Sequence, residues 1–211
     1  MTQGEKIVDL GLKFSFSQLL SNGFTVFDIR HGSGPRFTLD HIVEDCRSAV
    51  QFIKEKAEEY DIDPGRIGVW GMSAGGYLAA FVGANFHSHV KAVVAYFPTG
   101  YNWNVEEEVR KTLPALQVEQ SVLEALSLEV QISENTSPTL IIYGEEDANF
   151  ITEQSDSLYA KMQELGVESK RIVIAETGHL FIRKDNQYNV QAGEYAMTEL
   201  MHWFRKYLLD Q

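Results

Sequence analysis

The residue best placed to do chemistry in this sequence is a serine in a tight turn. The apolar run 66–70 leads into residues 71–76, which read Gly-Met-Ser-Ala-Gly-Gly, and a helix-prone segment follows at 77–81. A Gly-x-Ser-x-Gly turn between a strand and a helix lifts the serine hydroxyl above the edge of a parallel sheet. The pattern therefore predicts a serine hydrolase with Ser73 as its nucleophile.

A serine hydroxyl needs a base within hydrogen-bonding reach and a carboxylate that orients this base. Two later strands offer these groups at their carboxyl ends. The apolar run 139–143 precedes Gly-Glu-Glu-Asp at 144–147, and the run 171–175 precedes Glu-Thr-Gly-His at 176–179. Ser73, Asp147 and His179 would follow one another in the chain order of α/β-hydrolases. The alternative reading is a turn serine, a helix-capping carboxylate and a loop histidine; Glu145 and Glu146 also compete for the acid role.

Composition limits the class of protein and its partners. The chain has 211 residues, of which 44% are hydrophobic and 23% charged, so we expect one globular domain over residues 1–211. A net charge of −12 argues against nucleic acid or anionic membrane surfaces as partners, because both would repel it. Cys46 is the only cysteine, which excludes a disulfide framework, and its place on an apolar helical face favours a core thiol.

No metal or cofactor is expected. His87 and His89 lie two residues apart before a strand, but no nearby cysteine or carboxylate completes a ligand set, which favours a solvated loop. His41 and His202 fall on predicted helices, whereas His31 follows a predicted strand and could border the pocket of Ser73. No run is long enough to cross a bilayer, and residues 1–6 lack the features of a secretion signal. The compartment and the oligomeric state stay open.

Apolar strand-like runs alternate with helical patterns along the chain, which is typical of an α/β fold. We expect a mostly parallel sheet with helices on both faces and ligands at the carboxyl ends of the strands. The strands are predicted at 23–29, 66–72, 90–97, 138–143 and 171–175, and the helices at 39–60, 153–165 and 194–208. Residues 100–137 interrupt the alternation with helical stretches around 105–113 and 118–128. This segment is predicted to be a short helical cap insertion, with Trp103 in its local core.

Three segments together resemble the α/β-hydrolase family, in the esterase and lipase branch related to acetyl esterases and hormone-sensitive-lipase-like enzymes. They are the long elbow Asp-Ile-Asp-Pro-Gly-Arg-Ile-Gly-Val-Trp-Gly-Met-Ser-Ala-Gly-Gly at 61–76, the strand and acidic turn at 138–147, and Gly178-His179. The resemblance favours Asp147 as the acid, because it lies three residues after Gly144, as in the family.

The resemblance implies cleavage of carboxylic esters of small or medium acyl groups. Ser73 would attack the ester carbonyl, His179 would carry the proton, and Asp147 would hold the imidazole in its working tautomer, with an acyl-enzyme as intermediate. The backbone N–H of Ala74 would bind the oxyanion. The second oxyanion donor would come from a loop after the third strand of the family, and no such loop is visible in this sequence.

The first strands of the family are also missing. Residues 23–29 correspond to its fourth strand, which leaves residues 1–13 for everything earlier. Because the third strand lies between the fourth and fifth in the family, its absence predicts a gap beside the elbow strand. Each buried unpaired backbone group there would cost about 1 to 3 kcal/mol. Residues 7–10 could replace the strand, the fourth strand could slide across, or the chain could be incomplete; we expect incompleteness, which an in-frame stop codon just upstream of Met1 would contradict.

Two other functions fit the same residues. Prolyl-oligopeptidase-type serine peptidases share the elbow and the acid-to-histidine spacing. A weakly active or non-catalytic protein of the hydrolase fold would retain the triad residues without a complete oxyanion hole.

Overall fold

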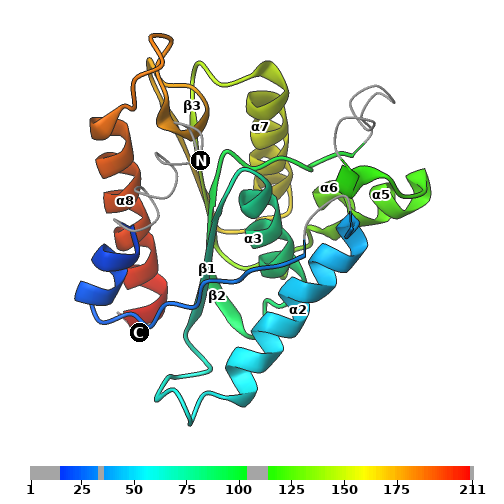
Figure 1. Ribbon diagram of the computed structural model, residues 1–211, viewed down its shortest axis with the longest axis vertical. Coiled ribbons are helices and arrows are strands. Elements are labelled where there is room, and N and C mark those ends of the chain that lie inside the picture. The colour runs from blue at the N-terminus through cyan, green and yellow to red at the C-terminus, as the bar shows by residue number, and fades with distance from the viewer. Residues whose placement is uncertain (1–14, 33–35, 104–113, 210–211) are drawn as a thin grey trace.

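The computed structural model describes residues 15–32, 36–103 and 114–209. Its centre is a sheet of four parallel strands in the order β1-β2-β3-β4, so each strand pairs with the next one along the chain (Figure 1). The strands are β1 (Ile67–Met72), β2 (Val90–Tyr96), β3 (Thr139–Gly144) and β4 (Ser169–Ile174). Four of the five predicted strands are therefore present, and their parallel alignment brings their carboxyl ends to one edge.

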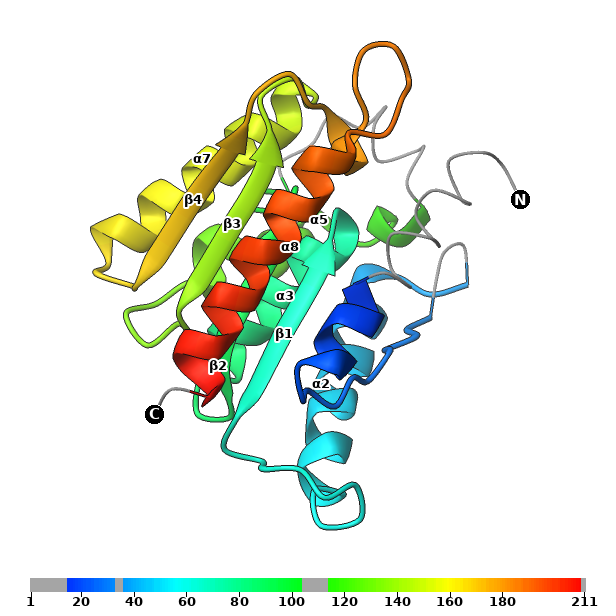
Figure 2. The same cartoon turned by 90° about the vertical axis from the view of Figure 1, so that its left-hand side faces the viewer.

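Helices cover both faces of this sheet, as the α/β pattern predicts. α8 and a short helix at residues 15–21 lie on one face, while α2, α3 and α7 lie on the other (Figures 1 and 2). The long helices are α2 (Leu39–Glu55), α3 (Ala74–Asn85), α7 (Asn149–Glu164) and α8 (Val190–Phe204), which continues into the π-helical turn η3 (Arg205–Leu209). α7 and α8 each begin four residues earlier than their sequence patterns predict.

The core lies between β2, β3 and the helices that pack on them. Every residue of β3 is buried, as is every residue of β2 except Lys91. α3 is apolar on all sides and is buried along residues 76–84, because it packs between the sheet and other helices. Gly83 brings α3 close to β2, since a Cβ at this position would lie 2.3 Å from Cγ2 of Val93. The helix that follows the elbow is thus fixed against the centre of the sheet.

The predicted cap is partly described. Its described residues form η1 (Pro114–Leu116), α5 (Gln120–Leu126) and α6 (Leu128–Gln131), while its expected helix at 105–113 lies outside the described residues. Trp103 is buried and packs edge-on against Tyr77 of α3, with ring centroids 5.1 Å apart. This packing places Trp103 at the contact between the segment and the α/β core.

The prediction of a strand at residues 23–29 is wrong. Residues 24–32 have no strand pairing, and the segment runs along β1 without hydrogen bonds to it, separated by a cavity that both segments line. An apolar, β-prone sequence forms a strand only where a neighbour offers its backbone groups, and no described strand does so here. The fourth strand has therefore not slid across to pair with β1, and the proposed substitute at residues 7–10 lies outside the described residues.

The fit between α3 and β2 gives a test of the packing. Gly83→Ala is expected to lower the free energy of unfolding by about 1 to 3 kcal/mol, because the added methyl group overlaps the fully buried Val93. Gly75→Ala in the same helix is the control, since nothing lies within 4 Å of its Cβ position and alanine raises helix propensity by at most about 1 kcal/mol. Urea denaturation of both variants measures the difference; equal stabilities would contradict this packing.

Candidate active site

Ser73 lies at the apex of a strained turn between β1 and α3. Its backbone has φ 56° and ψ −120°, a conformation that costs a non-glycine residue about 1 to 3 kcal/mol. The turn closes so tightly that a Cβ on Gly71 would lie 2.1 Å from the carbonyl oxygen of Gly75. The N–H of Ser73 donates to the carbonyl of Tyr96 at 2.8 Å, which ties the turn to the end of β2. Gly71 of the motif is therefore required by the backbone geometry, whereas the position of Gly75 has room for a Cβ.

His179 lies in a compact loop after β4. The loop closes through the N–H of Gly178, which donates to the carbonyl of Ile182 at 2.8 Å, and it passes through η2 (His179–Phe181). The ring of Phe97, which follows β2, packs against the imidazole with centroids 5.1 Å apart. Phe97 is fully buried, so the imidazole packs against an aromatic ring that its neighbours hold in place.

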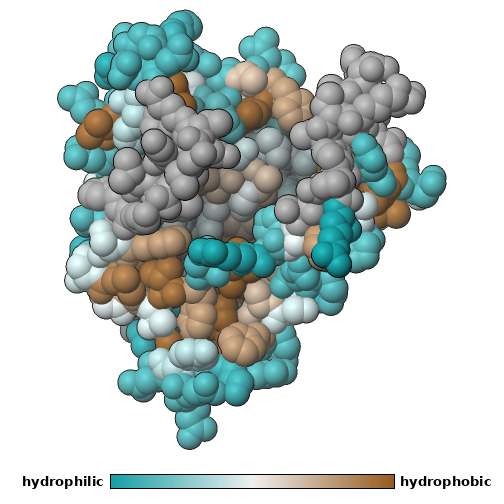
Figure 3. Space-filling model, in the orientation of Figure 1, coloured by the Kyte–Doolittle hydropathy of each residue, from teal (hydrophilic) through white to brown (hydrophobic). Residues whose placement is uncertain are grey.

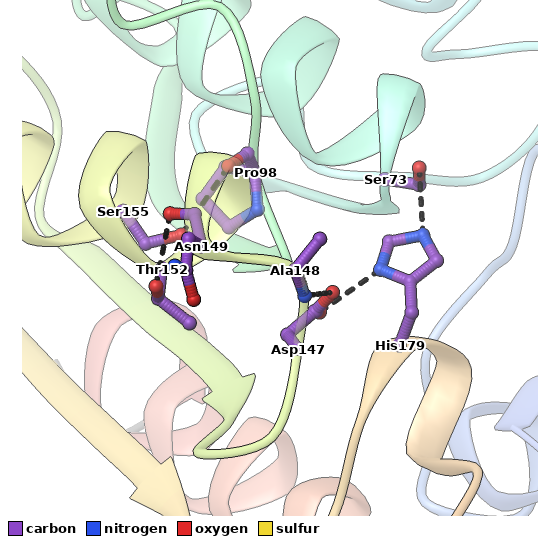
Figure 4. A network of polar contacts seen from close by, with 8 residues as sticks. All are labelled: Ser73, Pro98, Asp147, Ala148, Asn149, Thr152, Ser155 and His179. Atoms are coloured by element: carbon purple, nitrogen blue, oxygen red, sulfur yellow. Dashed lines mark hydrogen bonds and ion pairs between the residues drawn. The ribbon is translucent and has the colours of Figure 1, made fainter.

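The three residues predicted from the sequence lie in contact (Figure 4). Nε2 of His179 is 3.1 Å from Oγ of Ser73, and Nδ1 of His179 is 2.9 Å from Oδ2 of Asp147. The side chain of Asp147 is 0% exposed and that of His179 is 34% exposed. The imidazole thus joins a buried carboxylate to a serine hydroxyl, which is the geometry that activates a serine nucleophile.

The structure separates the three acidic residues that follow β3. Glu145 is exposed, and the carboxylate of Glu146 pairs with Nζ of Lys184 at 2.8 Å. Asp147 is buried, and its Oδ1 accepts the N–H of Ala148 at 2.8 Å while Oδ2 contacts His179. Of these three carboxylates, Asp147 is the one that contacts the imidazole.

Two buried polar residues that sequence reasoning missed support the histidine loop. Nδ2 of Asn189 donates to Oγ1 of Thr177 at 2.9 Å, and the N–H of Asn189 donates to the carbonyl of Phe181 at 2.7 Å. The Asn189 side chain also caps α8 by accepting the N–H of Ala192 at 3.2 Å. An asparagine just before a helix is a sequence signal for an N-cap, but a predicted helix start at residue 194 concealed it.

Two further residues singled out from the sequence, Ala74 and His31, lie near the serine turn. Ala74 is the first residue of α3, so its N–H belongs to the helical turn whose donors have no partner within the helix. Its role as an oxyanion donor stays a prediction. His31 lines the cavity beside β1, which reaches Gly71 and Gly75 on either side of Ser73.

The other histidines considered in the sequence lie away from the contacts among Ser73, His179 and Asp147. Nε2 of His89 lies 2.9 Å from Nζ of Lys54, while His87 and His202 are exposed. In the described part of the chain, no three His, Cys, Asp or Glu residues are grouped so that they could hold a metal ion. The same described residues include no helix that combines the length and the apolar character needed to span a membrane.

The parallel sheet, the covering helices and the serine turn define an α/β-hydrolase. Residues 2–162 match the family model BD-FAE. The chain belongs to this BD-FAE family, an esterase family of the α/β-hydrolase fold.

Among related proteins, endo-1,4-beta-xylanase B of Butyrivibrio fibrisolvens is 26% identical over an alignment 176 residues long, which covers 75% of this chain and 28% of that protein. The uncharacterized peptidase YuxL of Bacillus subtilis (strain 168) is 24% identical over an alignment 189 residues long, which covers 78% of this chain and 27% of that protein. The chain thus spans little more than a quarter of either relative. Among solved structures, carboxyl esterase 2 from the mycorrhizal fungus Tuber melanosporum matches with a TM-score of 0.73 and 24% identity, over 92% of this chain and 73% of that one.

The hydrogen bond that supports the histidine loop can be tested by measuring the free energy of unfolding. Thr177→Val keeps the shape of the side chain but leaves Nδ2 of the buried Asn189 without its acceptor. We expect the free energy of unfolding to fall by about 1 to 3 kcal/mol. Thr198→Val is the control, because the Thr198 hydroxyl is exposed and donates to the carbonyl of Glu194; its effect should stay within about 0.5 kcal/mol. Chemical denaturation measures both, and equal losses would argue against a supporting role for Thr177.

Proposed function

We propose that this protein hydrolyses carboxylic esters of small or medium acyl groups, with Ser73 as nucleophile, His179 as general base and acid, and Asp147 as the orienting carboxylate. One observation carries the proposal: the unbroken line of contacts from the buried Asp147 through His179 to Ser73. These residues come from three separate strand ends. Membership of an esterase family supports the same reaction.

The contacts suggest a sequence of proton transfers. Nδ1–H of His179 donates to Oδ2 of Asp147, which leaves the lone pair of Nε2 directed at the Ser73 hydroxyl. As Oγ attacks the ester carbonyl, Nε2 takes its proton; it then gives this proton to the departing alkoxide, and an acyl-enzyme and a free alcohol result. Water, deprotonated by the same nitrogen, releases the acid and restores the serine. Burial of the Asp147 side chain favours a fixed imidazole orientation throughout.

The negative charge that develops on the carbonyl oxygen needs donors. Ala74 N–H is the first candidate, because it lies next to the nucleophile in the opening turn of α3. We assign no second donor. Loss of one such donor costs roughly a hundred- to a thousandfold in turnover, so near-background release of p-nitrophenol in the assay below would identify a weakly active protein.

We also propose that residues 100–137 form the cap that limits the size of the acyl group. The described part of this segment is held against the core by the hydroxyl of Tyr77, which donates to the carbonyl of Leu126 at 2.8 Å. The N–H of Leu128 donates to the carbonyl of Gly100 at 2.9 Å, which closes the segment onto its own start. A segment fixed in this way would limit the room for the acyl group.

A serine peptidase of the prolyl-oligopeptidase type is the second candidate. The observation that favours it is the match to a relative described as a peptidase. Esters and amides share the acyl-enzyme mechanism, so the contacts of Ser73, His179 and Asp147 serve both reactions. The preference for ester or amide substrates distinguishes the esterase from the peptidase.

Ser73→Ala tests the nucleophile and the reaction together. The parent chain should react with a fluorophosphonate probe and hydrolyse p-nitrophenyl acetate faster than peptide anilides, and the variant should lose both activities, because it has no hydroxyl to attack. Gel fluorescence and release of p-nitrophenol are the measurements. Equal labelling of both proteins would exclude Ser73, and preferred cleavage of anilides would favour the peptidase.

Substitution of each acidic residue after β3 tests the orienting carboxylate. Asp147→Asn is expected to lower kcat by about 10⁴-fold, because an amide at this position favours the wrong imidazole tautomer. Glu145→Gln and Glu146→Gln are matched controls, since neither carboxylate contacts His179. Their kcat values should stay within a few-fold of the parent. A larger loss in either control than in Asp147→Asn would reassign the acid.

A further inference from the structure

Ser155 is a buried polar residue of α7 that takes no part in the proposed proton transfers. Its side chain is 0% exposed, and its hydroxyl donates to the carbonyl of Pro98 at 3.2 Å. Hydrophilic side chains gather elsewhere at the surface, for example over the loop at residues 183–187 at the top of the molecule (Figures 1 and 3). The other buried residues of α7 are Leu158 and Met162. Because a buried hydroxyl is tolerated only when it is hydrogen-bonded, the contact with Pro98 distinguishes Ser155 from these apolar neighbours.

The contact with Pro98 holds the backbone next to Phe97. Phe97 has a φ of 48°, which is strained for a bulky residue and must be held by its surroundings. Its N–H donates to the carbonyl of Ile142 in β3 at 2.8 Å, and the carbonyl of the following residue accepts the Ser155 hydroxyl. The strained residue is therefore tied to β3 on one side and to α7 on the other.

This backbone directs an aromatic ring at the imidazole of His179. The Phe97 ring is fully buried, and its centroid lies 5.1 Å from that of the imidazole, with an angle of 58° between the two planes. Phe181 packs against the same ring with centroids 4.7 Å apart. Since the ring is attached to the strained residue itself, a change in the backbone at Phe97 would move it and leave the imidazole room to rotate.

The same helix also holds the carboxylate that contacts His179. Asp147 lies two residues before α7, and its Oδ1 accepts the N–H of Ala148 at 2.8 Å. The carbonyl of Ala148 accepts the first hydrogen bonds of the helix. Ser155 follows about 9 Å from the start of α7, at a rise of about 1.5 Å per residue. α7 therefore connects Asp147 to the support of the Phe97 ring (Figure 4).

A second contact between α7 and the loop after β2 lies farther from Phe97. Oε1 of Gln154 accepts the N–H of Asn102 at 2.9 Å, and Nε2 of Gln154 donates to the carbonyl of Asn102 at 3.3 Å. These two hydrogen bonds remain when the Ser155 hydroxyl is removed. Replacement of Ser155 therefore tests the hold on Phe97 and not the docking of the whole helix.

We propose that Ser155 is a positioning residue for ester hydrolysis, which acts by holding the ring of Phe97 against the imidazole of His179. This role rests on the proposed function, in which that imidazole moves protons between the reacting oxygens. Without the hydroxyl, the imidazole would spend less time in the orientation that proton transfer needs. The contacts of Ser155 lie inside the protein, so its loss should lower kcat and leave KM unchanged.

Ser155→Ala tests this role against a matched control. Ser137 is another buried serine, whose hydroxyl donates to the carbonyls of Gly83 and Val90, and it precedes β3 at the end of the sheet away from the site. Both Ser155→Ala and Ser137→Ala should lower the urea midpoint of unfolding, since each leaves carbonyls without a donor. With p-nitrophenyl acetate, kcat should fall about tenfold in Ser155→Ala alone, with KM within about twofold of the parent. A parental kcat in Ser155→Ala, or equal losses in both variants, would overturn the proposal.

A double variant tests whether Ser155 acts through the aromatic ring. Phe97→Leu keeps an apolar side chain but removes the ring that packs on His179. Once the ring is gone, loss of the Ser155 hydroxyl should change kcat by no more than about twofold, because the two residues belong to one chain of contacts. If the separate losses of kcat multiply in the double variant, Ser155 does not act through Phe97 and the proposal fails.

The proton on Nδ1 of His179 gives a readout that needs no substrate. In the hydrogen bond to Asp147 it should appear as a downfield proton NMR signal, assigned by its absence in Asp147→Asn. The signal should broaden in Ser155→Ala, because a less restrained imidazole exposes this proton to exchange with water, and it should stay sharp in Ser137→Ala. An unchanged signal in Ser155→Ala would overturn the proposal, even if Phe97→Leu does not fold. Ester hydrolysis that survives Ser73→Ala would refute the proposed function instead, and the signal would still decide whether Ser155 holds the imidazole.

Discussion

The reversal of the chain at the carboxyl ends of parallel strands is the constraint on which the site depends. Ser73, Phe97 and Glu176 each follow a strand closely, and each has a positive φ, of 56°, 48° and 54°. Such a backbone costs a non-glycine residue about 1 to 3 kcal/mol, so the surrounding packing must hold it in place. At Ser73 this is done by the absence of side chains on Gly71 and by the hydrogen bond to Tyr96.

Rigid neighbours maintain the contacts between the three site residues. Asp147 is buried at the end of β3, Phe97 supports the imidazole, and Asn189 connects the histidine loop to the first turn of α8. Ser155 of α7 donates to the carbonyl of Pro98 at 3.2 Å, which links this helix to the loop after β2 (Figure 4). The imidazole is therefore positioned by elements from both sides of the sheet, and little reorganisation is needed to use it.

Among the described residues, β1 and β4 are the two edge strands of the sheet, and they differ in composition. β4 ends the sheet with paired basic side chains, whereas β1 ends it with an apolar sequence that faces a cavity. The serine turn directly follows β1 and leads into α3.

The sequence by itself predicted four parallel strands, the long helices and the three residues that meet at the site, because local patterns and turn chemistry are sufficient for these. It predicted a gap beside β1, but it also predicted a strand at residues 23–29. Only the tertiary structure decided that this segment pairs with nothing, since strand pairing depends on a neighbour that is distant in sequence. The family resemblance already favoured Asp147 over Glu145 and Glu146, and the tertiary structure placed its buried carboxylate against His179. Only the tertiary structure brought Asn189 to the histidine loop, because a contact between segments distant in sequence depends on how the chain packs and is not encoded in the spacing of residues along it.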